Sequence, residues 1–205
     1  MVKTDAYRRG EAFSAHAGSY KRPLFLIAHQ DDELGYAGLI QRLGPKTRFV
    51  WLTNGDGLYF ESDLTPPEYA EVRKAEAVNA VGVLGISAAH TACLDFSEAD
   101  IYRRLSQLHA GTTAMPEQMP FFTTIRDAVR KTIFEMRPDI VFTCAYQGGH
   151  PEHDLTHFFT RRALDDYARE TGIAVPFFHL PEYEYTILLA FRFHPLYRAR
   201  VTASN

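Results

Sequence analysis

Residues 24–33 of the sequence read LFLIAHQDDE, an apolar run (24–28) that ends abruptly in a polar cluster (29–33). A short uninterrupted apolar run is typical of a strand buried on both faces, as in a parallel sheet. Helical apolar spacing follows over residues 34–43, and Gly44-Pro45 ends it. The stretch therefore predicts a buried strand, a polar loop at its carboxyl end, and a helix.

The same strand and helix pattern recurs along the chain. Because strands that alternate with helices form βαβ units, we expect an α/β fold: a Rossmann-like, mostly parallel sheet with helices on both faces. The 205 residues suit a single domain, 1–205, with an irregular polar arm over 1–22 and loops over 58–66 and 111–120. Further strands are expected at 48–53, 89–94, 139–145, 175–180 and 184–191, and further helices at 66–84, 97–109, 121–136 and 151–170.

Composition excludes several classes of protein. With 46% apolar and 23% charged residues, the chain resembles ordinary soluble globular proteins. A net charge of −3 gives no reason to expect a nucleic-acid partner. No apolar run reaches the roughly 18 residues of a membrane span, and the N-terminus lacks the apolar stretch of a secretory signal. The two cysteines, Cys93 and Cys144, are expected to be buried thiols, so we expect a cytoplasmic protein.

Polar clusters follow three of the expected strands, at residues 29–33, 53–57 and 147–153. In open α/β sheets, ligands bind outside the carboxyl ends of the strands, so these clusters indicate an enzyme site. His29, Asp32 and His153 form a donor set that suits Zn²⁺ with one open position. Asp31 would then act as the base that takes a proton from metal-bound water.

Two plainer interpretations compete with this one. Asp31 or Asp32 could cap the helix that begins near Glu33, a role compatible with the functional one. His153 and His157, four residues apart on one helix face, could form a different ligand pair, although that pair leaves the first cluster unexplained.

In addition, the sequence resembles the PIG-L (LmbE-like) family of zinc-dependent N-deacetylases. The family's motifs are A-H-P-D-D-E, T-x-G, R-x-x-E-x-x-x-A-x-x-x-L-G, R-P-D-hydrophobic and H-P-D-H. They appear here, in the same order, at 28–33 (AHQDDE), 53–55 (TNG), 73–85 (RKAEAVNAVGVLG), 137–141 (RPDIV) and 150–153 (HPEH).

This resemblance implies His29, Asp32 and His153 as zinc ligands and Asp31 as the general base. His150 would stabilise the oxyanion and could assist the leaving amine, and Glu152 would orient His150 by accepting its other ring proton. The family implies Zn²⁺, with Fe²⁺ as the other candidate in the cell.

Substrate contacts are expected from four further residues. The resemblance assigns Arg73 to the substrate's hydroxyls, although an ordinary surface ion pair fits that helix position equally well. Asp95 follows a strand where relatives place a sugar-binding carboxylate. Tyr59 and Phe60 lie in a loop beyond the second strand, where they would either stack on a sugar ring or cover the core.

The function implied is hydrolysis of an N-acetyl group on an N-acetylglucosaminyl-type sugar or conjugate, giving acetate and a free amine. The alternatives are an amidase acting on another N-acyl or thiol conjugate, and a member that binds metal or ligand without catalysis. Two residues depart from the family pattern: Gln30 replaces proline, and Glu152 replaces aspartate. Neither departure removes a ligand or the base.

Overall fold

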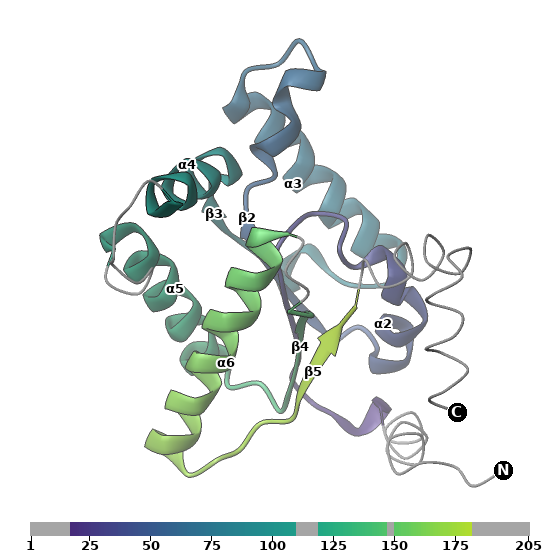
Figure 1. Cartoon of the computed structure of the whole chain (residues 1–205). Coiled ribbons are helices and arrows are strands. Elements are labelled where there is room, and N and C mark those ends of the chain that lie inside the picture. Colours follow the sequence, from purple (N-terminus) through teal and green to yellow (C-terminus); the bar gives the residue numbers. More distant parts are fainter. Residues whose placement is uncertain (1–16, 110–118, 147–149, 182–205) are drawn as a thin grey trace, which may run out of the picture.

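The computed structural model describes residues 17–109, 119–146 and 150–181 (Figure 1). Its centre is one sheet of five parallel strands in the order β3-β2-β1-β4-β5. This confirms the predicted Rossmann-like fold with its parallel sheet. The strands are β1 (Pro23–Ile27), β2 (Arg48–Thr53), β3 (Thr91–Phe96), β4 (Ile140–Cys144) and β5 (Phe177–Leu180).

The helices follow the predicted positions closely. The α-helices are α2 (Ala37–Leu43), α3 (Pro66–Val83), α4 (Glu98–His109), α5 (Pro120–Met136) and α6 (Pro151–Thr171), and the short 3₁₀ turns are η1 (Ala17–Ser19), η2 (Leu34–Tyr36), η3 (Asp56–Glu61) and η4 (Ala88–His90). Two expectations differ. The helix expected from residue 34 begins as a 3₁₀ turn, because Gly35 and Gly38 weaken its first turns. Part of the expected loop at 58–66 forms η3.

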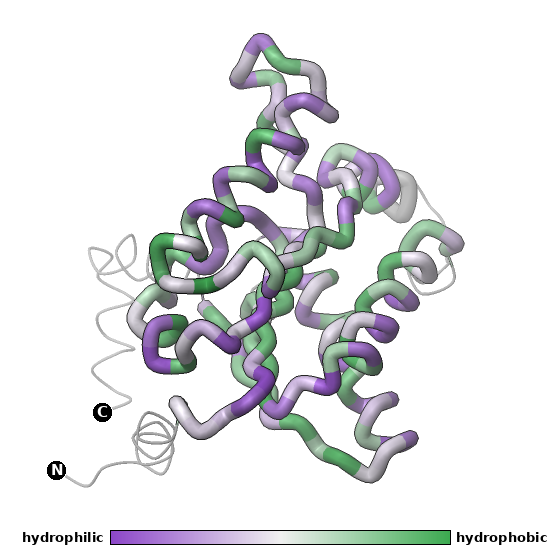
Figure 2. The backbone as a smooth tube through the Cα atoms, turned by 180° about the vertical axis from the view of Figure 1, so that it is seen from behind, coloured by the Kyte–Doolittle hydropathy of each residue, from purple (hydrophilic) through white to green (hydrophobic). Residues whose placement is uncertain are grey.

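Helices cover both faces of the sheet, as Figure 1 shows. Along β1, Phe25 and Ile27 pack with α2 and α3, while Leu24 and Leu26 pack with α4, α5 and α6. Phe25 lies at the centre of the first layer, with its ring stacked 4.8 Å from both Phe49 and Phe142. The strands accordingly form the hydrophobic centre of the backbone trace in Figure 2.

The strand order places a cleft where the site was expected. The chain leaves β1 toward β2 on one side, and β4 joins β1 on the other, so the order reverses between β1 and β4. The loop after β1 (29–33) and the start of α6, which follows β4, therefore meet at this reversal point. None of the helices in the described ranges is both long and apolar enough to cross a membrane.

Some expectations fall outside the described residues. These are the strand at 184–191, most of the loop at 111–120, and most of the N-terminal arm.

Candidate metal centre and active site

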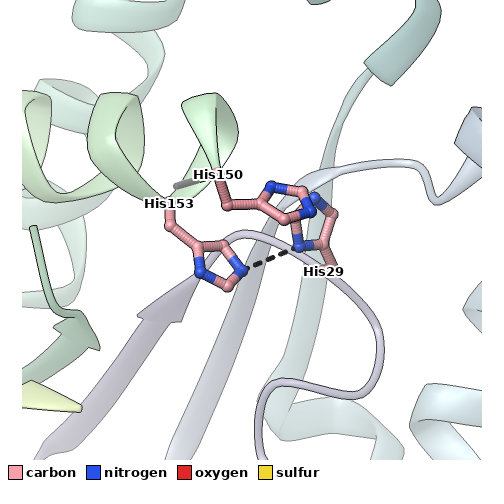
Figure 3. A group of neighbouring side chains, drawn as sticks. All are labelled: His29, His150 and His153. Atoms are coloured by element: carbon pink, nitrogen blue, oxygen red, sulfur yellow. Dashed lines mark hydrogen bonds between the residues drawn. The ribbon is translucent and has the colours of Figure 1, made fainter. Parts of the chain in front are cut away.

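Three side chains from the two sides of the reversal point converge on one spot. His29 Nδ1 lies 3.0 Å from His153 Nε2, His153 Nε2 lies 3.1 Å from Asp32 Oδ1, and His29 Nδ1 lies 3.6 Å from Asp32 Oδ1. All three residues are buried. In Figure 3, His29 approaches from the loop after β1, and His150 and His153 approach from the start of α6.

The polypeptide backbone fixes the carboxylate of this cluster. Asp32 Oδ2 accepts hydrogen bonds from the backbone N–H groups of Ala28, at 2.9 Å, and His29, at 2.8 Å. The thiol of Cys144, at the end of β4, donates to the same oxygen at 3.2 Å. Oδ1 is thereby aimed at the two imidazoles. The residues of the HQDDE loop form no side-chain cap on the following turn, so the capping interpretation does not describe this loop.

The geometry fits a divalent cation. Ligand atoms on a tetrahedral zinc ion, with bonds of about 2.0–2.1 Å, lie about 3.3 Å from one another. The three atoms are 3.0, 3.1 and 3.6 Å apart, close to one face of such a tetrahedron. Two imidazole nitrogens and one carboxylate oxygen are also the donor types that catalytic zinc sites use.

The charges of the cluster are strongly coupled. Burial by itself lowers the pKa of His29, but the hydrogen bond and charge of Asp32 raise it to about 9. Burial alone would raise the pKa of Asp32, but its hydrogen bonds to His153 and His29 hold that pKa well below its usual range. The carboxylate therefore stays ionised, and His29 keeps a proton at neutral pH until a cation displaces it.

His150 lies beside the cluster, with its ring stacked on His153 at 4.6 Å and edge-on to His29 at 4.6 Å. Its Nδ1 lies 2.9 Å from Glu152 Oε2, and Glu152 is completely buried. The structure thus brings together the predicted pair, and the longer side chain of Glu152 still reaches His150.

Asp31 lies at the cavity beside this cluster, and its side chain is 54% exposed. Its Oδ2 is 3.2 Å from Arg73 Nη2, and Arg73 also contacts Glu76 at 2.8 Å. Arg73 therefore combines the two interpretations of its position: it lines the cavity, and it forms ion pairs with carboxylates.

A cavity of about 400 Å³ opens above the cluster. Its lining includes the polar residues His29, Asp31, Asp32 and His150, and it also includes Leu58, Tyr69 and Tyr102. Sequence reasoning did not single out those three residues, because α3 and α4 bring the two tyrosines to the cavity from distant segments.

Glu98 is a further cavity residue that the sequence analysis missed. It is 9% exposed, accepts a hydrogen bond from Thr53 Oγ1 at 3.0 Å, and begins α4 directly after β3. Burial raises its pKa, while the charge of His29 and the bond from Thr53 oppose the rise. Its position just past a strand end was the signal that could have found it.

Asp95 is not brought to the described cavity lining. β3 extends to Phe96 and contains a register shift against β2, so Asp95 lies within the strand with a φ of 65°. Its carboxylate is 3.1 Å from Lys74 Nζ. Tyr59 and Phe60 pack edge to face on each other in η3, and neither lines the cavity.

Gln30, the residue in place of the family's proline, ties two strand ends together. Its side-chain amide donates to the carbonyl oxygen of Thr53 at 2.6 Å, and the residue is 3% exposed. Gly55 passes directly over it with a φ of 80°, where an added Cβ would meet the Gln30 amide and Arg73. The Gln30 hydrogen bond thus holds the loop of residues 29–33 against the end of β2.

His157 faces a different neighbourhood from His153. Its Nδ1 lies 3.0 Å from the carbonyl oxygen of Cys144, and its ring packs edge-on to His179 at 4.5 Å. The position of His157 therefore favours His29, Asp32 and His153 as the metal ligands over the pair His153 and His157.

Known proteins resemble this chain in sequence and in fold. A model of the PIG-L family, described as GlcNAc-PI de-N-acetylase, matches residues 24–164. The N,N'-diacetylchitobiose deacetylase from Pyrococcus horikoshii is 19% identical, with 80% of this chain and 60% of that chain covered and a TM-score of 0.56. The A40926 pseudoaglycone deacetylase Dbv21 is 26% identical, with 77% and 62% covered and a TM-score of 0.53.

A deacetylase of the teicoplanin biosynthesis pathway is 24% identical, with 76% of this chain and 65% of that chain covered and a TM-score of 0.52. The chain therefore spans less than two thirds of the length of these three deacetylases. A comparison with curated proteins gave no significant match.

Proposed function

The chain belongs to the PIG-L family, and from this premise we propose that it is a metal-dependent hydrolase that removes the N-acetyl group from an amino-sugar compound. The products are acetate and a free amine, and an N-acetylglucosaminyl compound is the proposed substrate. The observation that carries the proposal is the triangle of His29, Asp32 and His153, two of which line a cavity that Asp31 and His150 also line.

Zn²⁺ is the proposed cofactor, held by His29, Asp32 and His153. When bound, it would act as a Lewis acid toward the acetamide carbonyl and lower the pKa of water from 15.7 toward about 7. The protein contributes a preorganised ligand set, because backbone N–H groups and the Cys144 thiol hold Asp32 in place before any ligand arrives.

Asp31 and His150 are the proposed proton-transfer groups. Asp31 accepts the proton of the water that attacks the acetamide carbon, and Arg73 holds its carboxylate at the cavity. His150 donates a hydrogen bond to the oxygen that becomes negative, while Glu152 fixes the ring orientation. When the C–N bond breaks, the nitrogen takes a proton from Asp31 or from His150, and acetate leaves.

The sugar itself is proposed to bind between Arg73 and Glu98. Both line the cavity, and a guanidinium and a carboxylate provide a donor and an acceptor for neighbouring hydroxyls. Glu98 thereby takes the role expected of Asp95. Tyr69 provides aromatic surface for the sugar ring in place of Tyr59 and Phe60. Neither cysteine forms a disulfide, which supports the cytoplasm as the proposed location.

Release of acetate and of free amine from N-acetylhexosaminyl glycosides and other N-acyl compounds tests this function. The Asp31→Asn and His150→Ala variants should keep their zinc and lose about 10²–10⁴-fold in turnover, the usual contribution of acid–base groups. His153→Ala should lose zinc as well. His90→Ala is the matched control, because His90 contacts Pro45 at the opposite edge of the sheet. Wild-type turnover in the Asp31 or His150 variant would remove that residue from the mechanism.

A further inference from the structure

Three large apolar side chains are exposed on the segment that leaves the cavity at Leu58, and we call them the ridge. They are Leu58, Phe60 and Leu64, whose exposed fractions are 51%, 67% and 38%. The ridge belongs to η3 and the turn after it, which project with the start of α3 beyond the carboxyl edge of the sheet (Figure 1, blue segment at the top). Apolar and polar residues mix along this projecting segment in Figure 2.

The ridge and the cavity share Leu58, which lines the cavity together with Tyr69 and Tyr102. Leu58 is 51% exposed and Tyr102, on α4, is 45% exposed, so both side chains face solvent as well as the cavity. A molecule whose reacting amide lies at His29 and Asp31 therefore has two partly exposed apolar side chains in the lining of the same cavity.

The charges around the ridge limit what can lie on it. Residues 56–71 contain five carboxylates and no lysine or arginine, and Glu61 and Asp63 are exposed within the ridge segment itself. Arg73, the arginine of the described cavity lining, is already bonded to Asp31 and Glu76. On α4, Arg103 next to Tyr102 is paired with Asp100, and Arg104 lies over the Phe121 ring. A negatively charged group next to the sugar would thus face like charge, whereas a neutral or positively charged group would not.

We propose that the substrate joins its N-acetylated sugar to a neutral or cationic apolar group, which packs on Leu58 and Tyr102 and extends along the ridge to Phe60. This inference rests on the proposed deacetylase function and refines its substrate class. Continuity with the cavity favours the substrate itself as the occupant of the ridge, and the acidic surroundings oppose an anionic lipid surface.

Three N-acetyl-β-D-glucosaminides test the proposal: the methyl glycoside, the neutral 4-methylumbelliferyl glycoside, and the anionic 4-carboxyphenyl glycoside. Packing roughly 60 Å² of apolar surface corresponds to about tenfold in binding. We therefore expect kcat/KM for acetate release to be about tenfold higher for the umbelliferyl than for the methyl glycoside, mainly through KM. The kcat/KM of the carboxyphenyl glycoside should be close to that of the methyl glycoside.

The Leu58→Ser variant should lose most of the preference for the umbelliferyl glycoside, measured within that variant as the ratio of its two kcat/KM values. Phe60→Ser should reduce the preference by a smaller factor. Val83→Ser, at the far end of α3 and 87% exposed, is the matched control and should keep the full preference. Quenching of umbelliferyl fluorescence measures binding independently of turnover.

Equal kcat/KM for the methyl and umbelliferyl glycosides would overturn the ridge inference and leave the deacetylase function intact. Equal kcat/KM for the carboxyphenyl and umbelliferyl glycosides would overturn the inference that the apolar group carries no negative charge. If no glycoside released acetate, the proposed function would fail. Umbelliferyl binding that Leu58→Ser weakens would then still support the ridge, and absence of that binding would refute it.

Discussion

Zinc affinity should rise with pH, because His29 must lose its proton before Nδ1 can bind a cation. Its pKa of about 9 reflects burial, which lowers it, and the hydrogen bond and charge of Asp32, which raise it more. Displacing this proton costs about tenfold in apparent affinity for each pH unit below 9. The apparent affinity at pH 7 should therefore be about a fiftieth of its value at pH 9, where half of the His29 side chains are still protonated.

Competition with a chromophoric chelator between pH 6.5 and 9.5 measures this dependence. Calorimetry in two buffers of different ionisation enthalpy counts the proton that His29 releases. The raised pKa of His29 should also stabilise the folded, metal-free protein below pH 6.5, and this contribution to stability should disappear as the pH rises through about 9. A zinc affinity that is flat between pH 6.5 and 8.5, with no proton released, would refute the assigned charge of His29.

Three further predictions concern other parts of the structure. Burial raises the pKa of Glu33 to about 7, so the charge of this side chain opposes folding above pH 7 and has no effect below pH 4.5. In denaturant titrations, Glu33→Gln should therefore add about 3 kcal/mol to the free energy of unfolding at pH 8 and little at pH 4. An alanine at Gly57 would push the Glu98 side chain out of the cavity, so Gly57→Ala should raise KM several-fold in acetate assays, whereas Gly82→Ala, whose Cβ meets nothing, should not. Phe25→Ala should cost about 3–5 kcal/mol in the same titrations, and a loss below 1 kcal/mol would contradict its central place in the core.

Local patterns were sufficient to predict the sheet and the meeting of its polar loops. The apolar runs at residues 24–28, 48–53 and 139–145 are buried on both faces, which a parallel sheet requires, so each predicted its strand directly. Because polar residues follow β1 and β4 immediately, the topology alone brings His29 and His153 together.

Sequence patterns could not show which side chains line the cavity. The choice between Asp95 and Glu98 depends on a register shift late in β3, which the sequence does not reveal. Tyr69 and Tyr102 reach the cavity from two helices whose orientation is set by packing against the sheet and η3. These features arise from tertiary contacts and not from local periodicity.

Deacetylation should depend on one divalent cation held by His29, Asp32 and His153. Acetate release, measured while zinc is titrated into the metal-free protein, tests this dependence most directly. We expect no release without metal and an increase that levels off at one zinc per chain. Full release after chelation, or none at any zinc ratio across the N-acetylated substrates, would contradict it.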